Sequence, residues 1–125
     1  MREPAAPMSL ETYKILHIAG LVLLFLGLGG MLLAPIDKRP KLGYVLHGLG
    51  LLVLLVAGFG LMARMGIMGP GSWPVWLWCK MGVWLLMALL PMLVKKAIVP
   101  PFLGWLVAAA AGGAASWLAL LKPWI

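Results

Sequence analysis

The chain has 125 residues, of which 64% are hydrophobic and only 10% are charged, and ten Lys and Arg residues against three acids give it a net charge of +7. Soluble domains carry about 25% charged residues, so this composition excludes an ordinary soluble globular protein. Cys79 is the one cysteine, which excludes an internal disulfide and a multi-cysteine metal site.

Four apolar stretches occupy most of the chain, at residues 15–34, 42–63, 75–94 and 102–121. Each has about the 20 residues with which a helix crosses a hydrocarbon core of about 30 Å. The stretches therefore predict an all-α fold, a four-helix transmembrane bundle with antiparallel neighbours. Because the connections are short, we expect a single integral membrane domain over residues 1–125.

Local signals indicate where the helices begin and end. Ser9 is the expected N-cap of the first helix, about one turn before the membrane, and Pro35 ends that helix. We expect Pro91 to kink or close the third helix and Pro100 and Pro101 to start the fourth, because proline lacks the N–H that a helix interior needs. The longest connection, residues 66–74, is the one best suited to contact a partner or cover a pocket.

Basic residues gather in the first and third connections. The positive-inside rule therefore predicts that these connections are cytoplasmic and that both termini lie outside. Anionic lipid headgroups are the expected contacts of four side chains near this face: Lys41, His47, Lys95 and Lys96. No soluble basic face exists to bind nucleic acid, so the lipid bilayer is the expected partner.

Small residues recur at helical spacing in the apolar stretches. The first stretch has Gly20 and Gly27 on the face of His17, and the second has Gly50 and Ala57 on the face of His47. The fourth is rich in them, with Gly104, Ala108, Ala111, Gly112, Ala115 and Ser116. Small residues let helix backbones approach closely in lipid. Packing within one bundle is favoured over the alternative, in which residues 108–116 dock on another subunit of a homo-oligomer or a larger membrane complex.

Three ionisable side chains lie inside the stretches: His17, His47 and Lys80. Such residues are costly in a bilayer and point to function. No Asp or Glu lies in any stretch, which excludes a carboxylate proton relay and a carboxylate metal cage. A haem held by both histidines of one subunit is also excluded, because about 20 Å of helix rise separates two rings that must each come within roughly 2 Å of one metal.

The expected helix directions bring His17 and Lys80 to nearly the same depth on the outward side, where Arg64 ends the second helix. Three aromatic residues lie one turn from these two side chains along the helices: Tyr13, Trp76 and Trp84. Without an acid nearby, this cluster suits an anion or a flat acidic ligand. A porphyrin with propionates, a quinone and a lipid phosphate all fit, and His17 is the candidate haem ligand.

Each of these residues also has a purely structural interpretation. Lys80 can extend its side chain to the membrane interface. His17 can hydrogen-bond to a neighbouring helix or to interfacial water, and His47 can bridge helices instead of binding headgroups. The tryptophans fit interface anchors better than a cofactor site.

The residues Tyr13-Lys14-Ile15-Leu16-His17 open the first helix, and Trp76-Leu77-Trp78-Cys79-Lys80 open the third. This arrangement resembles a group of small four-helix bacterial membrane proteins that includes the SirB family, the CopD copper-resistance domain and the HemJ-type protoporphyrinogen oxidases. The resemblance implies the bacterial inner (plasma) membrane and, in the HemJ-type branch, a porphyrin facing His17 and Lys80. The SirB-like branch fits better, because residues 29–34 lack the basic, aromatic-flanked end that HemJ-type proteins have.

Three functional hypotheses remain open. The favoured one is a non-catalytic ligand-binding protein or accessory subunit that takes a haem or another porphyrin at the cluster of His17 and Lys80. The second is a HemJ-like enzyme that oxidises protoporphyrinogen with a redox cofactor. The third is a purely structural subunit of a respiratory or photosynthetic membrane complex.

Overall fold

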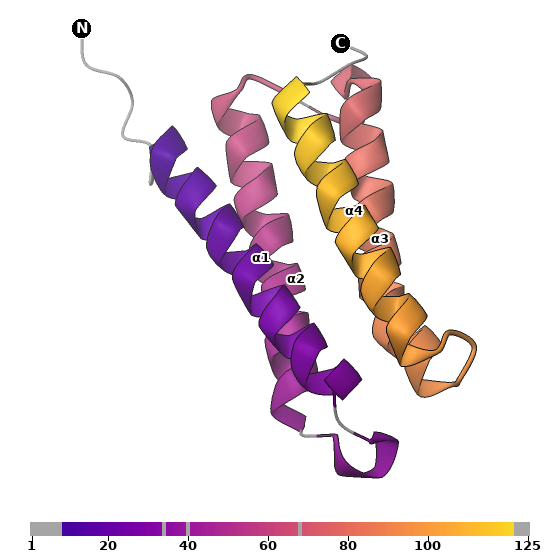
Figure 1. Cartoon of the computed structure of the whole chain (residues 1–125). Coiled ribbons are helices and arrows are strands. Elements are labelled where there is room, and N and C mark those ends of the chain that lie inside the picture. The colour runs from indigo at the N-terminus through magenta and orange to yellow at the C-terminus, as the bar shows by residue number, and fades with distance from the viewer. Residues whose placement is uncertain (1–8, 34, 40, 68, 122–125) are drawn as a thin grey trace, which may run out of the picture.

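The computed structural model describes residues 9–33, 35–39, 41–67 and 69–121. Its helices are α1 (Leu10–Leu33), α2 (Lys41–Arg64), α3 (Val75–Lys95) and α4 (Pro101–Leu121), with short 3-10 turns η1 (Ile36–Lys38) and η2 (Pro70–Ser72) in the connections (Figure 1). All four α-helices are long and apolar enough to cross a membrane. The prediction of an all-α bundle with four membrane-spanning helices is confirmed.

The ends of the helices follow from local chemistry. The Thr12 N–H donates to the Ser9 hydroxyl at 3.2 Å, and α1 begins directly after this cap. Pro101 is the first residue of α4, where a missing N–H costs nothing. Pro91 lies inside α3, which continues to Lys95, so the alternative in which this proline closes the helix is wrong.

The Ser9 cap provides a stability prediction. Ser9→Ala should lower the free energy of unfolding by about 1 kcal/mol, because a backbone N–H in the first turn of α1 loses its acceptor. The measurement is equilibrium unfolding in mixed detergent and SDS micelles. Ser116→Ala is the matched control: its hydroxyl donates to the Gly112 carbonyl within α4 and is exposed, so its loss should change little. Equal effects of the two substitutions would contradict the capping role.

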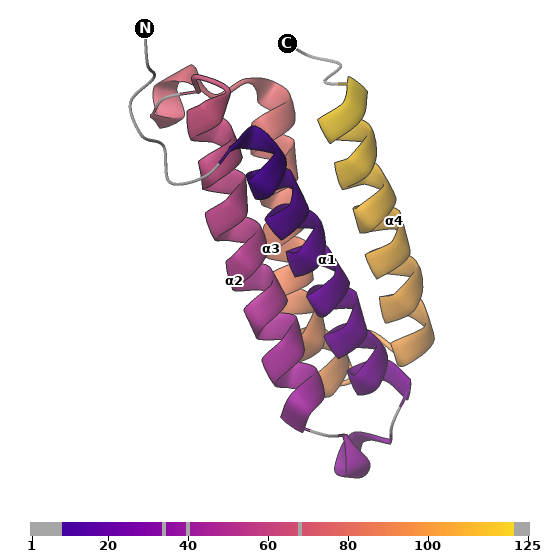
Figure 2. The ribbon, with the colours of Figure 1, turned by 90° about the vertical axis from the view of Figure 1, so that its left-hand side faces the viewer.

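Helices α1 and α2 share the most extensive contact in the bundle and lie side by side in both views (Figures 1 and 2). Glycines let the two backbones touch. A Cβ on Gly20 would lie 2.8 Å from the Leu54 backbone nitrogen, and one on Gly43 would lie 3.1 Å from the Gly27 carbonyl oxygen. Tyr13, near the start of α1, meets Gly60, near the end of α2. The contacts therefore pair the start of one helix with the end of the other.

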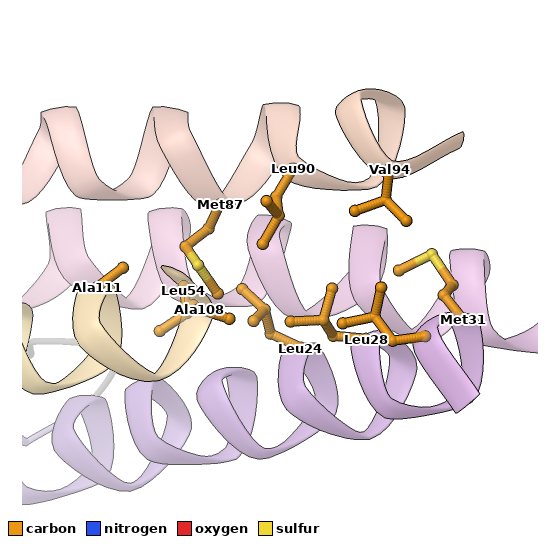
Figure 3. Close-up of a cluster of buried hydrophobic side chains, with 10 residues drawn as sticks. Leu24, Leu28, Met31, Leu54, Met87, Leu90, Val94, Ala108 and Ala111 are labelled. Atoms are coloured by element: carbon orange, nitrogen blue, oxygen red, sulfur yellow. The ribbon is translucent and has the colours of Figure 1, made fainter. Parts of the chain in front are cut away.

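Side chains from all four helices form the main hydrophobic core (Figure 3). Figure 3 shows Leu24, Leu28 and Met31 of α1 directed towards α3, from which Met87, Leu90 and Val94 point back. Leu54 of α2 and Ala108 and Ala111 of α4 complete the cluster. A second cluster lies between the end of α2, the start of α3 and the end of α4, and consists of Met62, Trp76, Leu77 and Leu118.

The small residues of α4 are used largely within the bundle. Gly104, Ala108 and Ala111 are buried. A Cβ on Gly104 would lie 3.0 Å from Val94 of α3, and one on Gly112 would lie 3.2 Å from the Phe25 ring of α1. In Figure 2, α4 stands at the edge of the bundle beside α1. These contacts fit packing within one bundle.

Much of the apolar surface of the helices faces outwards. In each helix, only between 22% and 33% of the most apolar window is buried. Large hydrophobic side chains are exposed on every helix, among them Ile18, Leu26, Leu52, Val56, Leu85, Leu106 and Leu120. Such a surface is far larger than the apolar patches of soluble monomers and is suited to a lipid environment. The structure thus fits a small integral membrane protein.

Candidate functional site

The face of α1 that carries Tyr13 and His17 packs against two glycines of α2. The Tyr13 ring lies against Gly60, and a Cβ on Gly58 would lie 3.5 Å from Cε1 of His17. Both glycines are places where α2 has no side chain, so they leave room for the two rings. Sequence reasoning missed this pair, although the signal was present: Phe59 is flanked by glycines on both sides in the second half of an apolar stretch.

A backbone carbonyl of α2 orients the half-buried His17 ring. Nδ1 lies 3.1 Å from the Leu54 carbonyl oxygen. Because a carbonyl oxygen can only accept, Nδ1 of the neutral ring carries the proton and Nε2 keeps its lone pair. This contact fits the predicted alternative in which His17 hydrogen-bonds to a neighbouring helix. It also fits a ligand role, since histidines that bind metals commonly donate their other N–H to a carbonyl oxygen.

Lys80 lies in α3, half-buried, and near enough to His17 for its charge to act on the imidazole. The sequence contains no Asp or Glu after Asp37. Lys80 therefore contributes positive charge from α3 that acts on the His17 imidazole. An anionic group on a ligand would be stabilised there, and a cation would be repelled.

The other predicted members of the cluster are distributed more widely. Trp76 is buried in the second hydrophobic cluster with Leu77 and Leu118. Trp84 donates its indole N–H to the Leu51 carbonyl of α2 at 3.0 Å. Arg64 is exposed at the end of α2. The two tryptophans thus have partners within the bundle, and Tyr13, His17 and Lys80 are the part of the cluster that best fits a ligand site.

His47 is buried, with 3% of its surface exposed, and both ring nitrogens face backbone carbonyls. Nδ1 lies 3.2 Å from the Leu24 oxygen of α1, and Nε2 lies 3.0 Å from the Met87 oxygen of α3. This position corresponds to the alternative in which His47 bridges helices. It leaves no ring nitrogen at the surface for a lipid headgroup.

The three lysines predicted to contact headgroups lie at the end of the molecule that holds the α1–α2 and α3–α4 connections (Figure 1). Lys41, Lys95 and Lys96 are exposed there, and Nζ of Lys95 lies 5.9 Å from the centroid of the Tyr44 ring. A charged group at that position can reach the membrane surface. The cytoplasmic location of this end and the bacterial inner membrane stay predictions.

The structure shortens the expected separation of the two histidines. His17 contacts Leu54, which lies about two turns after His47 along α2, so the rise between them is about 10 Å and not 20 Å. The glycine contacts, and not the ends of the apolar stretches, set the register of α1 against α2. A single metal held by both rings stays excluded, because both nitrogens of His47 already face carbonyls.

Within the described ranges, no three His, Cys, Asp or Glu side chains are close enough together to hold a metal ion. Comparisons with protein-family models, with curated proteins and with solved structures found no match. The resemblance to the SirB, CopD and HemJ-type group accordingly stays a prediction.

Proposed function

We propose that this small integral membrane protein binds a flat, acidic ligand at His17 and Lys80 without transforming it, and that haem or another porphyrin is the ligand. One observation carries the proposal. Nδ1 of His17 donates to the Leu54 carbonyl, which leaves the Nε2 lone pair available to bind a metal, and the charge of Lys80 acts on the same imidazole. A carbonyl partner of this kind fixes the ring orientation and tautomer that metal ligation requires.

The surroundings of His17 suit such a ligand. Gly58 leaves space beside the ring, and α1 exposes large apolar side chains such as Ile18 next to it in the chain. Haem would supply an iron that an imidazole nitrogen can coordinate. Lys80 would pair with a propionate, since an ammonium group forms its strongest hydrogen bonds with carboxylates. Tyr13 would border the site one turn towards the helix start.

The test is an absorption spectrum of the protein purified gently in detergent, without a histidine tag, before and after addition of haem and dithionite. The wild type should show a Soret band that shifts on reduction. His17→Ala should remove the signature of imidazole coordination. Lys80→Ala should weaken haem affinity about ten-fold, the worth of one charge-assisted hydrogen bond. Lys96→Ala, exposed at the opposite end of the molecule, should leave the spectrum unchanged.

Circular dichroism of each variant distinguishes lost binding from lost structure. The proposal predicts wild-type helicity in His17→Ala together with the altered spectrum. A flat visible spectrum of the wild type after haem addition would contradict the proposal. So would a Soret band that neither His17→Ala nor Lys80→Ala changes, because the haem would then be bound elsewhere.

A further inference from the structure

Pro91 leaves one backbone carbonyl of α3 without its helical partner. In an α-helix the carbonyl of residue 87 accepts from the N–H of residue 91, and proline has no N–H. Met87 is buried in the main core, away from the ends of α3. Inside a membrane there is no bulk water to satisfy such a group, so a neighbouring helix has to supply a donor.

His47 of α2 supplies that donor. Its Nε2 lies 3.0 Å from the Met87 carbonyl oxygen, so Nε2 carries a hydrogen. The same ring contacts α1, where Nδ1 lies 3.2 Å from the Leu24 carbonyl oxygen. One side chain of α2 thus contacts both α1 and α3. A second side-chain hydrogen bond, from Trp84 to the Leu51 carbonyl, also joins α3 to α2 but does not reach α1.

The two contacts together bear on the protonation of the ring, because both partners are acceptors. A neutral imidazole has one N–H donor and one lone-pair acceptor, whereas the imidazolium has two donors. Carbonyl oxygens accept and never donate, so a neutral ring in this position would direct a lone pair at a carbonyl oxygen. The imidazolium satisfies both contacts, and each becomes a charge-assisted hydrogen bond.

We infer that His47 is a proton-dependent clamp: its imidazolium ties the Met87 carbonyl that Pro91 leaves without a helical partner to the Leu24 carbonyl of α1. Loss of one proton removes one of the two hydrogen bonds and loosens α3 from the pair formed by α1 and α2. This inference concerns the bundle core and does not depend on ligand binding at His17.

The titratable groups nearest the clamp are few. On α2 the nearest is Tyr44, one turn before His47. On α1 it is His17, about two turns from Leu24, with Glu11, Tyr13 and Lys14 farther towards the helix start. On α3 they are Lys80 and Lys95, each about two turns from Met87, and Cys79 lies beyond Lys80. No titratable residue occurs in α4.

Nitrogen NMR of histidine-labelled protein tests the protonation directly. The chain has two histidines, so His17→Gln without a histidine tag leaves His47 as the one labelled ring. At pH 6 to about 7, the range in which histidine ordinarily titrates, both ring nitrogens should give protonated signals. A spectrum with one protonated and one bare nitrogen throughout this range would overturn the clamp.

A double-mutant cycle tests the link to Pro91 independently. Pro91→Ala restores an N–H for the Met87 carbonyl, so His47→Leu should be less harmful in that background. We expect the effect of His47→Leu on the unfolding equilibrium constant to be about five-fold smaller in the Pro91→Ala variant than in the wild type, the size of one net hydrogen bond. Equal effects in the two backgrounds would overturn the assignment. A haem spectrum unaffected by His47→Leu would leave the ligand site standing whatever the cycle shows.

Discussion

Gly27→Ala should lower the free energy of unfolding by about 1–3 kcal/mol, the usual cost of forcing an extra group into a well-packed core. A Cβ at Gly27 would collide with backbone atoms of Gly43 and His47, among them the His47 Cα at 2.9 Å. Backbone atoms cannot turn aside as a flexible side chain can. The helices α1 and α2 must therefore separate, which weakens their whole contact and displaces the His47 ring from the Leu24 carbonyl.

Gly29→Ala is the matched control for this substitution. It lies in the same helix, and a Cβ there would meet nothing within 4 Å. The change should leave stability unaltered or raise it by up to about 1 kcal/mol, because alanine favours a helix over glycine. Both variants can be compared by equilibrium unfolding in mixed micelles. Similar stabilities of the two would show that α1 and α2 are not packed backbone to backbone.

Leu90→Ala should destabilise the bundle by about 2 kcal/mol, the low end of the cost of such truncations in soluble cores. Leu90 is fully buried, at 0% exposure, within the cluster that joins all four helices. In lipid the unfolded reference is also apolar, so little transfer free energy is lost. The remaining free-energy cost is the loss of close contacts around the cavity that the truncation leaves, because lipid tails do not refill it.

Leu89→Ala is the matched control, because it truncates a leucine at the adjacent position of the same helix that is exposed and not buried. Leu89 is 41% exposed on the outer side of α3, so its truncation should change the unfolding free energy by less than about 0.5 kcal/mol. The pair is measured in the same micelle or bilayer system. A cost for Leu89→Ala as large as that for Leu90→Ala would mean that this face of α3 is covered by a protein partner instead of lipid.

Parts of the candidate site were predictable because they depend on position along a single helix. Tyr13 and His17 are four residues apart, so they lie on the same face of an α-helix. The direction of α3 brings Lys80 towards the level of His17. The roles of Trp76 and Trp84 were not predictable in the same way. Their ring partners, Leu118 and the Leu51 carbonyl, belong to other helices. A sequence pattern cannot choose between packing and ligand contact for an aromatic ring.

Sequence alone determined the number of the helices and, through local signals, where α1 and α4 begin. Hydrophobic length, the Ser9 cap and Pro101 act within a few residues of themselves, so α1 and α4 begin where local chemistry starts them. Pro91 likewise dictates from sequence that the Met87 carbonyl lacks its helical donor. Only the tertiary structure decided that His47 meets this carbonyl, and that Leu54 orients His17. The physical reason is that these partners depend on the register of α1, α2 and α3, which close backbone contact at glycines sets.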